Sequence, residues 1–522
     1  MSVSRVADTN AIIPPEVKFD IEHMPVENDP RKWSSFRKNF VLLQVAFGSM
    51  IAGLSANIQN REFTFLHDFP VPMEEQLNAT SSQISLTIAL FILVQGCMPL
   101  LWSAISEVKG RKAVYVSSLS IFCAGSLVVA TSKTIGLVIG FRCLQAAGEA
   151  PRQIDLPVLD FMRLMNLMQM GIYYMAPLLG PSLGPILGGA LTSGFSWRGP
   201  FYFLAIVAGL VCLSFLLFFK DTFRRERSLT YQRALKHRLR EEMHRAPEIK
   251  EGQKSEPQTK ETPTSGKAND SDLEKQQERV KESLPNIKLT LMDISPVRPL
   301  WDVVRRPNNF CILLASGLLF SFCFVVPYTS SRTLGTYYNY NALEIGLVLL
   351  SFGLGNMAGS VLGGRWSDYQ LAKLKAANGG KGQPEMRLRS TIHGSVLFPL
   401  FALGFAWVSD KHLHIAAMIV MLFFCGFVVI FVYTSTLAYI VDANVGRSST
   451  AVALNSAFRG IGAFIMTEVA VPMQDGLGDG WTYTIFSSLM IVSGMLILAV
   501  TYKGGQWRLA AEEREKTSEA KP

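Results

Sequence analysis

Ionisable side chains inside long apolar stretches of the chain are the residues most capable of chemistry. Arg142 and Glu149 lie in the stretch that begins near Thr134, and Glu468 lies within residues 449–471. A charge at the centre of a bilayer costs ~3 kcal/mol on insertion scales, so an ionisable residue there is a functional candidate by default. A carboxyl group shielded from water can exchange a proton near neutral pH. We therefore expect Glu149 and Glu468 to carry protons; the equal alternative for Glu468 is a water-accessible position near the outer interface.

The apolar stretches contain few other polar side chains, and these are candidates for lining a substrate cavity. They are Gln44, Asn57, Gln95, Tyr173, Asn356, Tyr433, Asn455 and Arg459. Arg459 precedes Glu468 by nine residues, which is two and a half helical turns. These two side chains therefore face different ways, and we do not expect them to pair.

The sequence lacks the residue patterns of common enzyme sites. It contains no GxxxxGK[ST] phosphate loop, no clustered His/Asp metal site and no nucleophile elbow. Its seven cysteines all lie in apolar stretches and form no CxxC pair, so they are interpreted as small buried hydrophobic residues. We expect no enzyme activity, no catalytic residue, no cofactor and no metal.

The elements that must position these residues are membrane-spanning helices. Hydrophobic residues make up 49% of the 522 residues and charged residues only 17%, whereas a soluble chain is about a quarter charged. The apolar residues form blocks of roughly twenty, which match the hydrocarbon thickness of a bilayer. We expect about twelve spans. The fourth begins near residue 134 and the fifth ends near residue 191. The others lie near residues 40–58, 84–105, 113–131, 199–219, 310–329, 345–362, 392–408, 414–440, 449–471 and 481–502. The predicted fold class is an all-α membrane protein with two six-helix bundles.

The predicted domains follow this duplication. They are a disordered cytosolic tail over 1–39, a bundle over 40–219, a largely disordered cytosolic linker over 220–308, a second bundle over 309–502 and a cytosolic tail over 503–522. The linker is too polar to bury the apolar surface that ordering requires, except at 296–304, where we expect an ordered helix. Transporters built from two such bundles hold substrate between them, near the bilayer midplane.

The distribution of charge predicts how the chain lies in the membrane. The net charge of +9 would suggest nucleic acid in a soluble protein, but here Lys and Arg cluster in the predicted inner loops and are sparse in the outer ones. This asymmetry predicts that both termini are cytosolic. We expect a monomer in the plasma membrane, or alternatively the vacuolar membrane, with no nucleic-acid partner. Asn78-Ala79-Thr80 is a glycosylation sequon in a predicted outer loop, although such triplets often occur by chance.

The loop after the second predicted span resembles the signature loop of the major facilitator superfamily. The matching residues are Glu107, Gly110, Arg111 and Lys112, and Ser103 replaces the usual glycine. Gly364 and Asp368 repeat the glycine–acid spacing after the eighth span. An acidic group at a helix end that faces basic groups on neighbouring helices can latch the cytosolic side. The alternative is an ordinary solvated loop; the second copy favours the latch.

Residues 142–148 resemble the second motif of that superfamily. In this motif an intramembrane arginine is followed three residues later by glutamine, as Arg142 is by Gln145. The resemblance implies a role for both residues in proton coupling, with Glu149 two turns from Arg142 along the same face. The alternative is an arginine that only fixes helices through hydrogen bonds.

The fifth predicted span resembles the motif of the superfamily's proton-coupled exporters. The motif residues are Gly180, Pro181, Gly184, Pro185, Gly188 and Gly189. Glycines four residues apart form one flat helix face for close packing, and prolines bend a helix. Gly355, Gly359 and Gly363 repeat this spacing in the eighth span. Because the fifth and eighth helices of this superfamily meet across the two halves, we expect the two glycine faces to pack together.

A narrower resemblance rests on residues 439–462, 299–302 and 170–175. These segments are similar to the fungal drug:proton antiporters with twelve spans, and most similar to the quinidine-resistance and dityrosine-exporter group. The resemblance covers about residues 33–502. It implies the major facilitator fold with pseudo-twofold symmetry, and efflux of small organic molecules, such as drugs, toxic cations or secondary metabolites, in exchange for protons.

Two segments depart from the family pattern. Residues 151–168 contain prolines and charges where the family has small residues, and residues 61–72 lengthen a loop that is usually short. Both segments are either genuine divergence or translated intron. The alternative function is therefore a transport-defective product, or a membrane receptor or regulator that kept the fold without transport.

Overall fold

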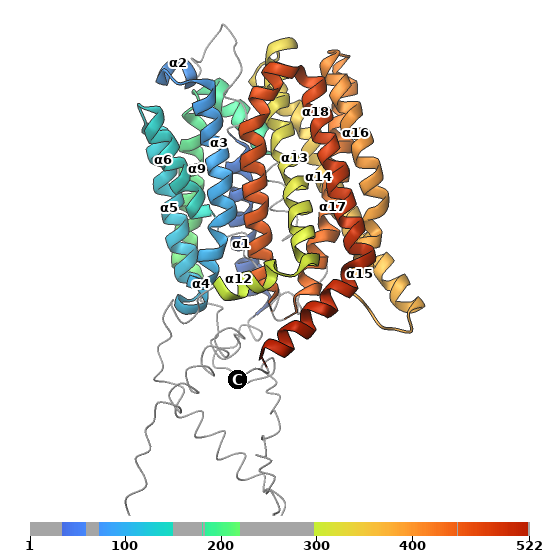
Figure 1. Cartoon of the computed structure of the whole chain (residues 1–522). Helices are drawn as coiled ribbons and strands as arrows, with labels where there is room; N and C mark the ends of the chain where they lie inside the picture. The colour runs from blue at the N-terminus through green and yellow to red at the C-terminus, as the bar shows by residue number, and fades with distance from the viewer. Residues whose placement is uncertain are drawn as a thin grey trace, which may run out of the picture. The chain divides into compact units, whose positions relative to one another are not determined.

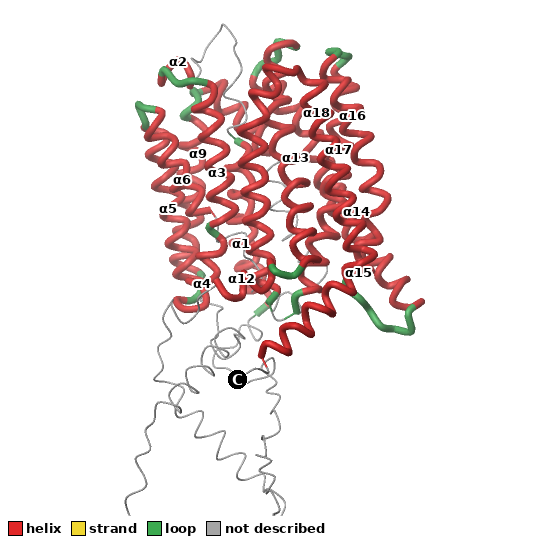
Figure 2. The backbone as a smooth tube through the Cα atoms, viewed as in Figure 1, coloured by secondary structure: helices red, strands yellow, loops and turns green. Residues whose placement is uncertain are grey.

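The computed structural model describes residues 34–58, 73–149, 180, 183–219, 297–445 and 447–519. These residues are almost entirely α-helical and include no strand (Figure 2). Within them, nine helices are long and apolar enough to cross a membrane. Tyr173, Pro181, residues 151–168 and residues 61–72 lie outside the described residues.

The first half of the chain contributes helices that match the predicted spans closely. They are α1 (Ser35–Asn57), α2 (Met73–Leu77), α3 (Ser81–Cys97), α4 (Pro99–Lys109), α5 (Arg111–Thr131), α6 (Ile135–Glu149), a helical stretch over 183–194 and α9 (Gly199–Phe218). The helix α1 begins five residues before the predicted start of the first span. The Ser34 side chain accepts a hydrogen bond from the backbone N–H of Arg37 and caps the helix there.

The second half of the chain forms longer helices. They are α12 (Val297–Val304), α13 (Pro307–Tyr337), α14 (Ala342–Ala377), α15 (Glu385–Leu388), the short 3₁₀ helix η6 (Arg389–Thr391), α16 (Ile392–Asp410), α17 (Ile415–Ala443) and α18 (Ser448–Glu519). The helix α12 occupies the place where an ordered helix was expected. α18 contains one non-helical residue, Gly478 at φ 78°, which separates the last two predicted spans.

The long helices run side by side between two ends (Figure 1). We call one the basic end, because Lys109, Arg111 and Lys112 lie there at the junction of α4 and α5, together with α12 and α15. The opposite end carries α2 and the Gly478 turn of α18. The predictions place the basic end in the cytosol.

Two close approaches of backbone join the halves of the chain. A Cβ atom built on Gly96 of α3 would lie 2.6 Å from the Cα atom of Gly460 in α18. A Cβ atom on Gly346 of α14 would lie 2.8 Å from the carbonyl oxygen of Pro185 in the fifth span. Only glycine allows two helices to come this close, so these positions form two seams, which we call the α3–α18 seam and the fifth-span–α14 seam.

The expected pairing of the two glycine faces is wrong. Gly180, Gly184 and Gly188 pack on α1, where a Cβ on Gly180 would lie 2.5 Å from the carbonyl oxygen of Met50. The face formed by Gly355, Gly359 and Gly363 instead packs on α17, against Phe423, Phe427 and Phe431. Each glycine face therefore joins helices of its own half, and the fifth span meets α14 through Pro185 and Gly346.

Helical structure continues beyond the predicted end of the last span. α18 continues to Glu519, and its final turns are tied to the basic end by ion pairs. Arg306 donates to both carboxylate oxygens of Glu515, at 3.0 and 2.9 Å, and Arg447 also pairs with Glu515. Arg508 pairs with Glu385 of α15 at 3.0 Å. Most of the predicted C-terminal tail is thus a fixed part of the second half.

Candidate functional site

Arg142 lies on α6 in the interior of the first bundle. Its side chain is fully buried, and its Nη1 donates to Gln145 Oε1 at 2.7 Å. The Gln145 amide in turn donates to Ser126 Oγ of α5 at 2.7 Å. The guanidinium lies 4.1 Å from the centroid of the Phe91 ring, which adds a cation–π attraction. The structure thus brings Arg142 and Gln145 into direct contact, as their spacing of three on a helix allows.

Glu149 lies at the end of the described part of α6 and is also fully buried. One carboxylate oxygen accepts a hydrogen bond from Ser55 of α1, and the other accepts one from Gln95 of α3. A single carboxyl group therefore connects three helices of the first bundle. Gln95, predicted to line a cavity, is a partner of Glu149.

The second bundle holds a polar group of its own around Arg459 of α18. Its Nη1 donates to the hydroxyl oxygen of Tyr433 at 2.8 Å, and Asn455 Nδ2 donates to the same oxygen at 3.3 Å. The guanidinium lies 3.5 Å from the centroid of the Phe320 ring of α13. The structure therefore brings together three of the predicted cavity residues, and it adds Phe320, which the sequence gave no reason to select among 33 phenylalanines.

Glu468 lies farther along α18 and is half-buried. Its Oε1 atom is buried and has no hydrogen-bond partner in the described part of the chain. Nine residues on an α-helix rise about 13 Å, so Glu468 cannot reach Arg459 directly. This agrees with the expectation that the two do not pair.

The predicted latch residues lie at the basic end. Gly110 has φ 84° and joins α4 to α5, a conformation that favours glycine. Arg111 is the first residue of α5, and Lys112 Nζ donates to the Leu216 carbonyl oxygen of α9 at 2.9 Å. The Glu107 side chain is outside the described atoms, so its part in the latch stays a prediction.

The second copy of the latch forms the expected kind of contact. Asp368 of α14 accepts from Arg387 Nη1 of α15 at 2.8 Å, and Arg387 Nε also donates to Asp442 of α17. One arginine thus connects α14 and the end of α17, both in the second half, through their carboxylates. Asp442 was not among the predicted latch residues, although its place before a polar turn was a possible signal.

The other predicted cavity residues lie in contacts between or along helices. Gln44 donates to Ser214 Oγ of α9 at 2.6 Å, and Asn57 donates to the Gly53 carbonyl oxygen at 3.2 Å. The Oδ1 atom of Asn356 is buried without a partner among the described residues. Gly189 is buried in the fifth span. Asn78 is exposed at the opposite end, directly after α2.

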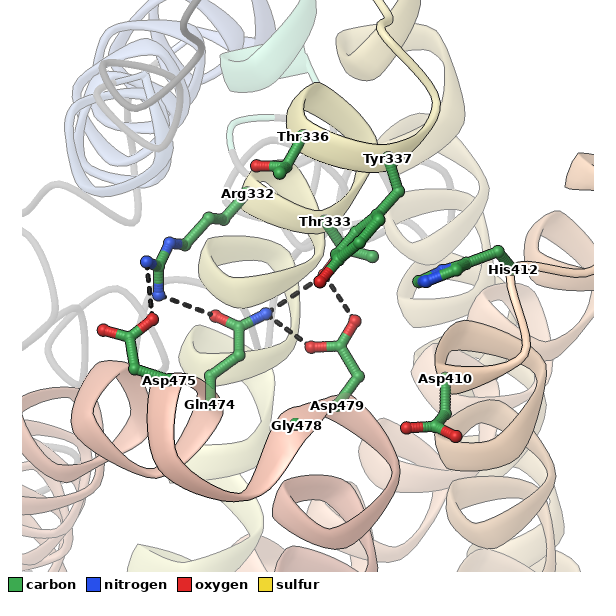
Figure 3. A pocket seen from close by; sticks show the side chains of 10 residues that line it. All are labelled: Arg332, Thr333, Thr336, Tyr337, Asp410, His412, Gln474, Asp475, Gly478 and Asp479. Carbon is green, nitrogen blue, oxygen red and sulfur yellow. Dashed lines mark hydrogen bonds and ion pairs between the residues drawn. The ribbon is translucent and has the colours of Figure 1, made fainter.

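A polar pocket at the opposite end was missed by the sequence reasoning (Figure 3). It has a volume of about 230 Å³ and lies between the Gly478 turn and the ends of α13 and α16. Its most buried carboxylate, Asp479, accepts from Thr333 at 2.7 Å and from Gln474 at 2.6 Å, while Arg332 pairs with Asp475 at 2.6 Å. The polar run between the last two spans was the available signal. These contacts hold the turn against α13.

Comparisons with known proteins agree with this architecture. Residues 45–467 match the family model of the Major Facilitator Superfamily. The chain is 23% identical to Quinidine resistance protein 3 of Saccharomyces cerevisiae over 93% of this chain and 85% of that protein. It is 26% identical to Multidrug transporter DTR1 of Candida glabrata, with 91% and 86% covered, and 26% identical to Citrate exporter 1 of Aspergillus niger, with 92% and 88% covered.

These matches confirm the predicted all-α fold, the predicted resemblance to fungal resistance transporters and the expectation of a non-enzymatic protein. They also agree with a multi-pass membrane protein whose helices are apolar enough to span the bilayer. A family model that covers residues 45–467 leaves little of the membrane part unmatched. The chain therefore belongs to the Major Facilitator Superfamily of transporters.

Proposed function

We propose that the protein is an efflux transporter that exchanges protons for small organic molecules. The observation that carries the proposal is the fully buried Glu149, whose carboxylate is held by Ser55 and Gln95 on two other helices. A carboxyl in this position can take up and release a proton as the surrounding helices move. The names of its relatives, which include a multidrug transporter and a citrate exporter, support export as the direction of transport.

The proposed cycle uses the contacts described above. When Glu149 binds a proton, its negative charge is lost and the hydrogen bonds from Ser55 and Gln95 weaken, because charge-assisted bonds are roughly twice as strong as neutral ones. The ties between α1, α3 and α6 then loosen. The bundles rock at the α3–α18 and fifth-span–α14 seams, while the Asp368–Arg387 contact holds α14 and α15 together within the second bundle. Arg142 and Gln145 hold the proton-binding helix in register.

The test is efflux of the cationic dye rhodamine 6G from cells that express the chain, with and without a protonophore. We expect efflux that the protonophore abolishes and that Arg142→Ala lowers at least tenfold. Arg198→Ala is the matched control, because Arg198 precedes α9 and lies outside the buried Arg142 group, donating to the Ser132 carbonyl oxygen at 2.9 Å and lying over the Trp197 ring. Efflux that continues without a proton gradient contradicts the coupling. Absence of any transport from correctly localised protein would favour the receptor alternative.

We further propose that the basic end and both termini face the cytosol, that the protein acts as a monomer, and that it lies in the plasma membrane. Asn78 would then face outward and carry a glycan. An Asn78→Gln variant should run faster on a gel by about one glycan, and glycosidase treatment should remove the difference from the wild type. If glycosidase does not shift the wild-type band, this test gives no support to the proposed orientation. A glycan attached at the basic end would show that this end faces outward.

A further inference from the structure

The Arg459 group has hydrogen-bonding capacity that the described residues leave unused. Arg459 Nε is buried without a partner, and so is Oδ1 of the fully buried Asn455. The Tyr433 oxygen already accepts from Arg459 and from Asn455, so its own O–H remains available to donate. Buried polar atoms normally find partners, and an exception in a native structure calls for an explanation.

The charge of Arg459 is also uncompensated. No ion pair joins it to a carboxylate in the described part of the chain, whereas Arg306, Arg387 and Arg508 each have an acidic partner there. Glu468, on the same helix, is about 13 Å away along the axis. Among the described residues, the Phe320 and Tyr433 rings face the guanidinium, with their centroids 3.5 and 5.2 Å away. An arginine at membrane depth without a counter-charge is costly, and a bound anion would lower that cost.

The Arg459 group lies beside a seam between the two halves of the chain. Arg459 is next to Gly460, which forms the α3–α18 seam between the halves. Its side chain is half-buried, and Phe320 packs against a core cluster that contains side chains from both halves, including Phe91 under Arg142. The Arg459 group is therefore part of the interface between the two bundles.

We propose that the transported molecules include organic acids whose carboxylate binds Arg459 and the Tyr433 hydroxyl, and whose neighbouring hydroxyl or carboxylic acid group donates to Asn455 Oδ1. Guanidinium and carboxylate form the short, directional pairs that give arginine its preference for this group. The aromatic Phe320 ring supports the guanidinium from the side away from the ligand. This inference rests on the proposed efflux function and adds organic anions to the small molecules that the transporter exports.

The test measures binding to the purified full-length protein in lipid nanodiscs. The probes are lactate, malate and citrate, each compared with its neutral methyl ester, and succinate as the analogue of malate without the hydroxyl. We expect at least one acid to raise the unfolding midpoint of the wild type in a concentration-dependent way, its ester to have no effect, and succinate to bind more weakly than malate. No stabilisation by any acid overturns the inference.

Variants locate the effect at the proposed site. Arg459→Gln should weaken acid binding about 10- to 100-fold, as expected for loss of a charged hydrogen-bonding partner. Tyr433→Phe should weaken acid binding severalfold. This variant tests the site if Arg459→Gln does not fold. Arg332→Gln is the matched control, because Arg332 lies on the same half and already pairs with Asp475. Unchanged binding in both site variants overturns the inference.

Dye efflux from reconstituted vesicles separates this inference from the proposed function. If Arg459→Gln exports rhodamine 6G in exchange for protons at the wild-type rate, and the wild type binds no acid, the antiporter proposal stands and the organic-acid site is wrong. If acid binding depends on Arg459 but no proton-driven flux occurs, the organic-acid site stands and the antiporter proposal is wrong.

Discussion

Among single residues, the two membrane carboxyls differ most in their surroundings. Glu149 is fully buried and accepts hydrogen bonds from Ser55 and Gln95. Glu468 is half-buried, and its Oε1 atom has no partner in the part of the chain that the structure describes. A carboxylate with two donors on other helices can change helix contacts when it binds a proton. A carboxylate without such donors does not link helices, so its protonation does not change helix contacts in this way.

This difference predicts unequal effects of removing the two carboxyls. Glu149→Gln should lower proton-driven dye efflux at least tenfold, equivalent to about 1.4 kcal/mol, because the side chain keeps its shape but cannot exchange a proton. Glu468→Gln should lower it less. Both are measured in vesicles with a fixed pH gradient, alongside binding of dye without a gradient. Equal losses for the two variants contradict the assignment to Glu149.

The sequence predicted much of this site because the chemistry is local. Arg142 and Gln145 are three residues apart on one helix, so their contact follows from helical geometry. The partners of Glu149 could not be predicted, since Ser55 and Gln95 lie on other helices and periodicity does not say how helices are rotated. Phe320 was missed for the same reason. Long-range contacts depend on packing that a single sequence does not display.

Among helices, close backbone approach decides which elements can move against each other. The α3–α18 seam depends on Gly96 and Gly460, whereas the Gly359 contact with α17 lies within one half. Substitution at these two kinds of position should therefore have different consequences. The glycine spacing predicted flat helix faces correctly, but the partner helix was wrong for both faces, because spacing fixes a face and not its neighbour.

Gly96→Ala should reduce transport more than stability, because its Cβ would lie 2.6 Å from backbone of the other half. Gly359→Ala should mainly reduce stability, by about 1–3 kcal/mol as for other overpacked sites, since its Cβ would lie 2.1 Å from the Phe427 carbonyl oxygen. Gly140→Ala is the control, because no described atom of another helix lies within 4 Å of the added atom. Unfolding midpoint and efflux rate are measured for each. Identical profiles for Gly96→Ala and Gly359→Ala contradict the seam interpretation.

In the molecule as a whole, the end of the chain stabilises the basic end of the second half. Glu515 joins Arg306, which precedes α13, to Arg447, which precedes α18. The Arg306 side chain is 8% exposed, so loss of its partner leaves a buried charge uncompensated. Sequence reasoning described residues 503–522 only as a tail, because its charges fit a solvated segment as well as a docked helix.

Glu515→Gln should lower the free energy of unfolding by about 1–2 kcal/mol, because two arginines lose a charged partner. The measurement is thermal unfolding of the purified protein at low and high salt. Glu513→Gln is the matched control, because Glu513 is exposed on the same turn. A Glu513 effect as large as that of Glu515, or a Glu515 effect absent at low salt, contradicts a specific tie.

The Arg306–Glu515 pair also sets an order of events during synthesis. The two residues are separated by 209 positions, and a ribosome that adds about 5–20 residues per second needs about 10 to 40 s to pass from one to the other. Throughout that interval the seventh span can insert while its leading arginine has no carboxylate from the C-terminus. Assembly of this half is therefore completed only after residue 515 has been made, and a nascent chain that terminates before it would leave the nearly buried cation without that partner.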